Sequence, residues 1–147
     1  MEIERKFLVK ELPENLESYE QKHICQGYMC TNPVVCIRRS NDEYYLTYKG
    51  RGKMVREEHE FPLTVEAFEH MLPKIDGIII DKVRYLIPLA DGHTAELDIF
   101  QGVLAPLRLV EVEFASVEEA EQFEAPEWFG DDVTNSKEYH NSNLSQR

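Results

Sequence analysis

The sequence has little cysteine, no long apolar run and a shortage of positive charge. The three cysteines, Cys25, Cys30 and Cys36, are odd in number and match the spacing of neither a zinc ribbon nor a redox pair. The five histidines also lack ligand-like spacing. We therefore expect reduced thiols in a cytoplasmic protein without a zinc site. No apolar segment reaches membrane-spanning length and the N-terminus shows no apolar signal region, so we expect no membrane partner.

The charge balance is strongly acidic. The chain contains 28 Asp and Glu residues against 16 Lys and Arg residues, which gives a net charge of −12. Broad contact with a nucleic-acid backbone needs a basic surface, so no nucleic-acid partner is expected. An anionic small molecule would meet the same acidic field. Its binding would require local basic groups or bound divalent cations.

The 147 residues predict a single domain, 1–147, built mainly from short alternating strands. Thr64 and Ser116 are expected to cap two helices, at 64–72 and 116–123, the second with a capping box to Glu119. A third helix is expected near 136–144. The segment "GRGKM" lacks P-loop spacing and is expected to be a Gly-rich turn. The predicted strands are residues 2–10, 23–31, 34–40, 43–49, 54–62, 78–88, 94–100 and 107–115.

Short antiparallel connections favour closure of such a sheet, because a barrel has no exposed edges. The fold class is therefore α+β and mainly β: a closed eight-stranded antiparallel barrel with a few flanking helices.

The opening segment "MEIERKFLV" sorts its charges onto one face. In an extended strand Glu2, Glu4 and Lys6 share a face, and Ile3, Phe7 and Val9 share the other. The simplest interpretation is a solvated outer face of an antiparallel sheet. The pattern recurs, however, mostly acid with acid and base with base. The further charged positions are Arg38, Lys49, Arg56, Glu58, Glu60, Lys82, Arg84, Glu96, Asp98, Glu111 and Glu113.

Like charges two residues apart in one strand repel, and repeating that repulsion gains nothing structural. A pair of carboxylates becomes reasonable if it holds a cation, and a pair of bases if it holds an anion. If these faces point inward, the barrel is a charged tunnel. Carboxylate oxygens suit Mg²⁺ or Mn²⁺, and the bases would neutralise a polyphosphate, as phosphoryl transfer requires.

Several motifs in one order resemble a known family over almost the whole chain. They are the N-terminal E-x-E-x-K, "QGY" at 26–28, "IRR" at 37–39, "YLTYKG" at 45–50, "REEHEF" at 56–61, "DKVRY" at 81–85, "ELD" at 96–98 and "VEVEF" at 110–114. The chain resembles CYTH-domain proteins, also called triphosphate tunnel metalloenzymes. The resemblance implies an eight-stranded antiparallel tunnel that hydrolyses or cyclises a triphosphate-containing substrate.

The resemblance also implies roles for individual residues. The metal ligands would be Glu2, Glu4, Glu111 and Glu113. The phosphate-binding residues would be Lys6, Arg38, Lys49, Lys82 and Arg84, with Arg56 as a further cation. The remaining tunnel carboxylates would be Glu58, Glu60, Glu96 and Asp98. Lys6 and Tyr28 match a catalytic pair that activates water in small bacterial members. Tyr28 could equally be a core or rim aromatic residue.

One position departs from the family pattern. The third strand usually carries Arg-x-Arg on the tunnel face, and here Cys36 replaces the first arginine. The tunnel is therefore expected to lack one phosphate-binding cation. This loss would lower the affinity for triphosphate, shift the preference among substrates, or leave activity intact because Arg56 compensates. An inward thiol with basic neighbours is also expected to be reactive. The competing interpretation is a tolerated small residue at a peripheral site.

The leading hypothesis is a hydrolase that needs Mg²⁺ or Mn²⁺ and cleaves inorganic tripolyphosphate, a small-molecule substrate. Thiamine triphosphatase and class IV adenylate cyclase are rival activities of the same scaffold, although no motif specifies a nucleoside pocket. Two further hypotheses involve no catalysis: a polyphosphate or nucleotide sensor, and a structural protein with solvated strands. Assembly as a homodimer is left open.

Overall fold

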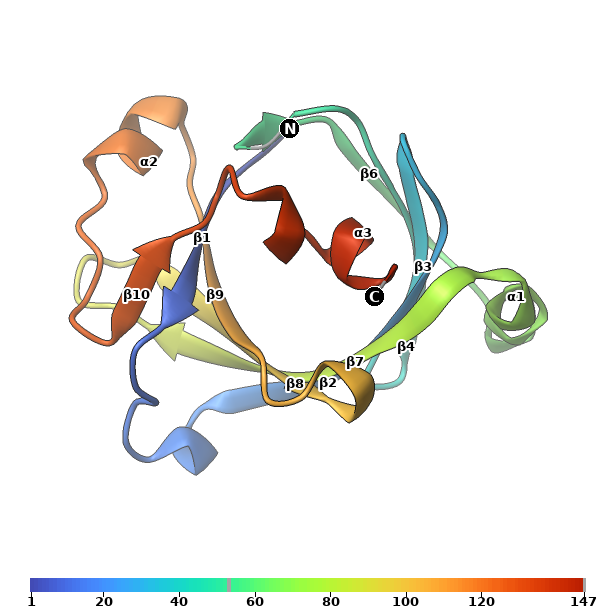
Figure 1. The fold of residues 1–147 in the computed structure, drawn as a ribbon, viewed down its shortest axis with the longest axis horizontal. Helices are drawn as coiled ribbons and strands as arrows, with labels where there is room; N and C mark the ends of the chain where they lie inside the picture. The colour runs from blue at the N-terminus through green and yellow to red at the C-terminus, as the bar shows by residue number, and fades with distance from the viewer. Residues whose placement is uncertain (53, 147) are drawn as a thin grey trace.

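Among the described residues, ten strands form one antiparallel sheet that curves into a nearly closed barrel (Figure 1). The computed structural model describes residues 1–52 and 54–146. The strand order is β10-β1-β9-β8-β7-β2-β3-β4-β6, and β5 pairs with β1. The strands are β1 (Glu2–Val9), β2 (Glu20–Thr31), β3 (Val34–Ser40), β4 (Glu43–Lys49), β5 (Val55–Arg56), β6 (Glu58–Pro62), β7 (Asp76–Pro88), β8 (Thr94–Gln101), β9 (Arg108–Glu113) and β10 (Phe129–Asp132).

The helices are short, and α1 and α2 lie outside the barrel (Figure 1). They are α1 (Val65–Met71), α2 (Val117–Gln122) and α3 (Asn141–Leu144), with 3₁₀ turns at Leu16–Ser18, Leu72–Lys74, Gly102–Leu104 and Lys137–Tyr139. Thr64 caps α1 by accepting a hydrogen bond from Ala67 N, and Ser116 caps α2 by accepting one from Glu119 N. The return bond of the expected capping box goes to the amide of Ala115 rather than to that of Ser116.

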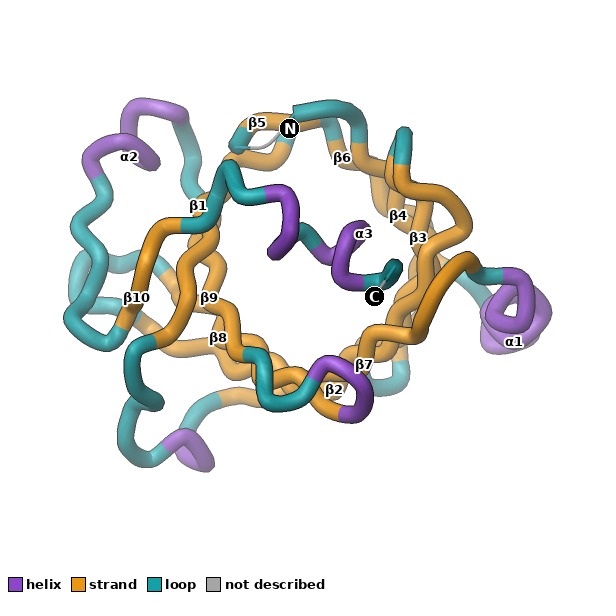
Figure 2. The backbone as a smooth tube through the Cα atoms, in the orientation of Figure 1, coloured by secondary structure: helices purple, strands orange, loops and turns teal. Residues whose placement is uncertain are grey.

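The barrel closes at a bend in the expected strand 54–62. Glu57 interrupts this segment, so that β6 pairs with β4 while β5 pairs with the start of β1. The strand order therefore gives the two halves one position in an eight-position wall. Figure 2 shows β5 and β6 next to each other on the ring. The tenth strand, β10, was not expected. It pairs with the end of β1 through Phe7 and Val9, beyond the two residue pairs that join β1 to β5.

The remaining boundaries differ from expectation by a few residues. The expected strands 34–40 and 43–49 are β3 and β4, whereas β2 and β7 begin earlier, at Glu20 and Asp76. The expected helix near 136–144 is a 3₁₀ turn followed by the single-turn α3. In the Gly-rich segment after β4, Gly52 has a φ of 126°, and a Cβ there would lie 2.1 Å from Val55 O. Only glycine fits this position; Lys53 lies outside the described residues.

The largest apolar cluster lies on the outer side of the wall. Phe7, Leu97 and Val110 point away from the charged face and pack with Ala120 of α2 and Phe129 of β10. Figure 1 shows α2 and β10 outside the ring, beside β1. Burial of this face explains why the alternate residues of β1, β8 and β9 are apolar. It also fixes the register that turns the charged residues inward.

A second apolar cluster lies inside the barrel with the C-terminal segment. Ile80, Phe100 and Leu109 pack with Leu144 of α3, which is fully buried. Figures 1 and 2 show α3 within the outline of the ring. The C-terminal segment therefore fills part of the barrel interior.

Candidate functional site

The remaining interior is a charged cavity of about 160 Å³. Seven glutamates and five Lys or Arg residues line it, together with a few small or aromatic side chains. All the candidate site residues from the sequence contribute to this lining except Lys82 and Asp98. The lining residues are Glu2, Glu4, Lys6, Tyr28, Val34, Cys36, Arg38, Lys49, Arg56, Glu58, Glu60, Arg84, Glu96, Glu111, Glu113, His140, Asn141 and Ser142.

Strand register brings the carboxylates together across β1, β9 and β8. Glu4 lies directly opposite Glu113, and Lys6 lies opposite Glu111. Glu111 in turn lies opposite Glu96 on β8. Because directly opposed residues of antiparallel strands have Cβ atoms about 5 Å apart, these charges interact strongly in a buried site.

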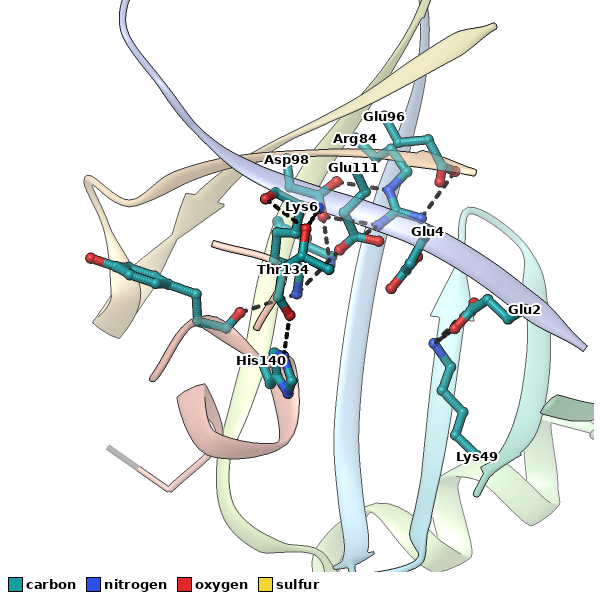
Figure 3. A network of polar contacts seen from close by, with 12 residues as sticks. Glu2, Glu4, Lys6, Lys49, Arg84, Glu96, Asp98, Glu111, Thr134 and His140 are labelled. Carbon is teal, nitrogen blue, oxygen red and sulfur yellow. Dashed lines mark hydrogen bonds and ion pairs between the residues drawn. The ribbon is translucent and has the colours of Figure 1, made fainter. Parts of the chain in front are cut away.

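Glu2 forms the centre of one ion-pair group. Lys49 points toward Glu2 (Figure 3), and its Nζ atom lies 3.2 Å from Glu2 Oε1 and 3.4 Å from Glu58 Oε2. Arg56 Nε lies 3.3 Å from Glu2 Oε1. Burial opposes ionisation of Glu2, but the charges of Lys49 and Arg56 and a hydrogen bond from Glu58 outweigh it and lower its pKa. Glu2 is therefore ionised at neutral pH.

Glu4 and Glu111 form a carboxylate pair with opposite properties. Burial, followed by repulsion from Glu111 and Glu2, holds the pKa of Glu4 well above its ordinary value. Burial also opposes ionisation of Glu111, but Lys6, Arg84 and Lys82 hold its pKa well below the ordinary value. Glu4 thus retains its proton to a higher pH than an ordinary carboxyl group and shares it in a hydrogen bond with Glu111. The pair shares one proton between two carboxylates because both cannot be charged side by side.

The donor set fits a hard divalent cation in place of that proton. Glu2, Glu4 and Glu111 supply only carboxylate oxygens, and the repulsion among them is the kind that a bound cation relieves. Across residues 1–52 and 54–146, no group of three or more His, Cys, Asp or Glu side chains stands ready to hold a metal ion. Lys49, Arg56 and Lys6 contact the glutamates instead, so binding would exchange these partners.

Arg84 is held by a buried carboxylate group behind the cavity wall. Its Nε and Nη2 atoms donate to Asp98 Oδ1 and Oδ2 at 2.7 and 2.9 Å, and its Nη1 atom donates to Glu96 Oε2 at 3.2 Å (Figure 3). Lys82 Nζ lies 2.7 Å from Asp98 Oδ2. Lys82 and Asp98 are 0% and 1% exposed, and neither lines the cavity. They support Arg84 rather than form the wall.

Tyr28, Cys36 and Arg38 lie on the wall formed by β2 and β3. Burial, slightly offset by the nearby positive charges, raises the pKa values of the Tyr28 phenol and the Cys36 thiol. The raised pKa favours the protonated thiol of Cys36, so it gives no support to the reactivity expected from its basic neighbours. Arg38 Nε is buried and has no hydrogen-bond partner within the described part of the chain. A phosphate oxygen in the cavity would satisfy this donor.

The C-terminal segment contributes residues that sequence reasoning missed. His140, Asn141 and Ser142 line the cavity beside the glutamates. Lys6 Nζ donates to the carbonyl oxygen of Tyr139 at 3.1 Å and lies 3.5 Å from Glu111 Oε1. These contacts engage the Lys6 ammonium with Tyr139 and Glu111, and both Lys6 and Tyr28 line the cavity. The only sequence signal for this placement was the amphipathic character of "EYHNSNL".

Glu58 predicts a pH dependence of stability in the metal-free protein. Burial, followed by a hydrogen bond to Glu2 and repulsion from it, raises the pKa of Glu58 to about 7. A carboxyl group whose pKa is raised by folding stabilises the folded state fully at pH values below its unfolded-state pKa. This stabilisation is lost as the pH rises through 7. In chelator, the melting temperature of the wild type is expected to fall between pH 5 and pH 8, and Glu58→Gln should flatten this fall by about 2–4 °C. The exposed neighbour change Glu57→Gln is the control, and an equal flattening there would contradict the assignment.

Known proteins are similar to this chain in both sequence and fold. The sequence model of the CYTH domain family matches residues 1–146. A curated inorganic triphosphatase of Nitrosomonas europaea is 41% identical over 147 residues, which covers 98% of this chain and 96% of that protein. An inorganic triphosphatase of Acetivibrio thermocellus is 35% identical over 150 residues, covering 97% of this chain and 92% of that protein.

The fold comparison agrees with these sequence matches. The crystal structure of an inorganic triphosphatase superposes with a TM-score of 0.76 at 39% identity, and the match covers 100% of this chain and 95% of that chain.

Among the helices of the described residues, none has both the length and the apolar character needed to cross a membrane.

Proposed function

The chain belongs to the CYTH domain family, and on that premise we propose that it is a divalent-metal-dependent triphosphatase acting on inorganic tripolyphosphate. Two relatives at 41% and 35% identity bear the name inorganic triphosphatase, which supports the proposal. The reaction is hydrolysis of a phosphoric anhydride bond. A cytoplasmic location is part of the proposal, supported by three free thiols.

The observation that carries the proposal is the size and charge of the cavity. Pockets for drug-sized ligands are about 300–1,000 Å³, whereas this cavity is about 160 Å³. Its lining alternates glutamates with bases and offers little apolar or aromatic surface for a nucleobase or a thiazole ring. A bare chain of phosphates fits these properties better than ATP or thiamine triphosphate, so the cyclase and thiamine triphosphatase activities are not favoured.

We assign the metal-holding role to Glu2, Glu4, Glu111 and Glu113. A bound Mg²⁺ or Mn²⁺ would supply positive charge to the phosphate oxygens. Loss of the proton shared by Glu4 and Glu111 would accompany binding, because both carboxylates are then needed as anions. Metal affinity should consequently rise with pH.

The five bases of the lining would hold the phosphate oxygens. Lys49 and Arg56 pair with Glu2, so substrate binding would exchange a carboxylate for a phosphate around each base. Arg38 brings a buried donor without a partner among the described residues, and Arg84 is fixed in place by Asp98 and Glu96. Fixed cations of this kind lower the barrier by positioning and charge stabilisation.

Lys6 and Tyr28 are the proposed catalytic pair. A water would attack the terminal phosphorus in line with the bridging oxygen; the bond from that phosphorus to the bridging oxygen breaks, and pyrophosphate leaves. One proton of the water stays on the new orthophosphate, and the other passes to the solvent. Tyr28 acts as a neutral phenol because burial raises its pKa, so it orients the reactants rather than removing a proton as a phenolate. Lys6 would leave the Tyr139 carbonyl to contact the substrate.

The test is phosphate release from tripolyphosphate, thiamine triphosphate and ATP, each with Mg²⁺, Mn²⁺ or chelator. Fast release from tripolyphosphate that requires the metal is the expected result, with release from the two organic triphosphates at least about 10-fold slower. Tight binding of tripolyphosphate without turnover would favour a sensor, and formation of cyclic AMP from ATP would favour a cyclase. Either result would reject the proposal.

A further inference from the structure

Gln26 is a buried polar residue in the wall next to Tyr28. It lies on β2 between Arg38 of β3 and Ile80 of β7, its cross-strand partners, and it is 0% exposed. Its Nε2 atom donates a hydrogen bond to the Tyr28 hydroxyl at 3.2 Å. Gln26 itself does not line the cavity, so any role in the reaction must act through Tyr28.

The neighbouring charges explain which end of the amide faces Tyr28. Gln26 Oε1 has no hydrogen-bond donor among the described residues. Its direct neighbour in the sheet is Arg38, and Lys82 lies two residues beyond Ile80 on the opposite adjoining strand. Positive charge on both sides of Gln26 favours an orientation in which the amide oxygen, the negative end of the dipole, points toward Arg38 and Lys82 rather than toward Tyr28. The NH₂ group is then left for the tyrosine hydroxyl.

This hydrogen bond determines where the phenolic hydrogen of Tyr28 points. A phenol has one hydrogen to donate and lone pairs that accept. Gln26 occupies an acceptor position of the Tyr28 oxygen from within the wall. The phenolic hydrogen therefore points away from Gln26, and the hydroxyl of Tyr28 can meet the cavity as a donor.

We propose that Gln26 is a positioning residue that makes Tyr28 a hydrogen-bond donor to an oxygen of the terminal phosphate. The proposal rests on the proposed triphosphatase function and deepens it, because it assigns Tyr28 to the oxygens on which charge is redistributed during P–O cleavage. Donors fixed in advance toward such oxygens are among the larger contributions to catalysis, about 100- to 1,000-fold for one group.

The kinetic test compares Gln26→Met and Gln26→Glu, each with and without Tyr28→Phe. Methionine keeps the length of the side chain but cannot donate, so we expect kcat for tripolyphosphate to fall about 10-fold with KM within about 2-fold. An ionised Gln26→Glu carboxylate only accepts, takes the phenolic hydrogen and should lower kcat further. With Tyr28→Phe, which alone should cost about 100-fold, Gln26→Met should have no additional effect. The exposed residue Gln21 on the same strand provides the control, Gln21→Met.

An equal fall in kcat from Gln26→Met with and without Tyr28→Phe would overturn the proposal, because Gln26 would then act independently of Tyr28. A second readout needs no turnover and distinguishes this failure from failure of the triphosphatase function. Tyrosines labelled with ¹³C at Cζ give one NMR signal each, and Tyr28→Phe identifies the signal of Tyr28. Gln26→Glu should move that signal whereas Gln21→Met should not; an unmoved signal would also reject the proposal. If Gln26→Glu moves the Tyr28 signal but the wild type releases no phosphate, the proposed function is rejected instead.

Discussion

Glu4→Gln is expected to abolish metal-dependent activity while making the metal-free protein more stable. The activity loss should be about 100- to 1,000-fold, because a neutral amide cannot replace a carboxylate in a site that must hold a cation. In chelator at pH 8, the melting temperature should rise by about 2–4 °C for each kcal/mol of relieved repulsion. A single substitution would then separate the demands of function from those of folding.

Glu4→Gln should stabilise the metal-free protein because the pKa of Glu4 is raised. Burial and the charges of Glu111 and Glu2 favour its protonated form in the folded state. The folded state therefore binds more protons than the unfolded state above pH 4.5, and wild-type stability falls as pH rises toward the raised pKa. Glutamine resembles the protonated carboxyl and does not titrate. The stability gap between Glu4→Gln and wild type should accordingly widen with pH.

Thermal unfolding from pH 5 to pH 9, in chelator and in excess Mg²⁺ or Mn²⁺, measures both effects. Wild type should gain about 2.7 kcal/mol when the metal is 100-fold above its dissociation constant, and the variant should gain far less. The exposed change Glu66→Gln on α1 is the control. A variant that is less stable than wild type in chelator at pH 8, or one that retains the full stabilisation by metal, would contradict this account of the carboxylates.

Arg84→Met is expected to have the largest effect on stability, a loss of about 3–5 kcal/mol in the free energy of unfolding. Arg84 is buried and donates to both oxygens of Asp98 and to Glu96, and it lies 4.0 Å from Glu111. Methionine fills a similar volume but leaves these carboxylates with too little positive charge. The penalty arises from uncompensated buried charge rather than from lost packing.

Urea denaturation of Arg84→Met, Arg84→Lys and the exposed-site control Arg39→Met tests this explanation. Lysine retains the charge but cannot form the two parallel bonds to Asp98, so its cost should lie between wild type and Arg84→Met. Arg39 donates to the Asn41 carbonyl on the outer face, and its change should cost about 1 kcal/mol or less. Equal losses for Arg84→Met and Arg39→Met would show that the buried group does not stabilise the fold.

Alternation along each strand was enough to predict which residues share the interior. Glu2, Glu4 and Lys6 face the cavity while Phe7 packs outside, because the period of a strand is two and one face of β1 is buried against α2 and β10. The same reasoning placed Glu111 and Glu113 inside. The resemblance to CYTH domains added the closed wall, which alternation alone leaves open to a flat sheet with solvated charges.

Alternation does not predict how deep in the barrel a residue lies or which distant segments it contacts. These two properties decide which inward residues line the cavity, and where β10 and α3 lie. Lys82 and Arg84 share a face and a strand, yet only Arg84 reaches the cavity, since distance along the barrel axis decides what lines it. The strand β10, "FGDD", has no alternating pattern and forms because Phe129 joins the outer apolar cluster. The entry of α3 into the barrel follows from burial of Leu144, a single residue in a polar tail.

The closure of the wall beside the start of β1 has a mechanical consequence. Among the described residues, two residue pairs, Glu2 with Arg56 and Ile3 with Val55, join β1 to β5, and Glu4 N donates one further bond to Met54 O. The pairings of β1 with β9 and of β4 with β6 each share five residue pairs. The backbone amides at this seam should exchange with deuterium before those of β7 and β8, because fewer hydrogen bonds must break for it to part. The strand at this seam, β1, also carries Glu2 and Glu4. We therefore expect any opening of the wall here to move these two carboxylates with it.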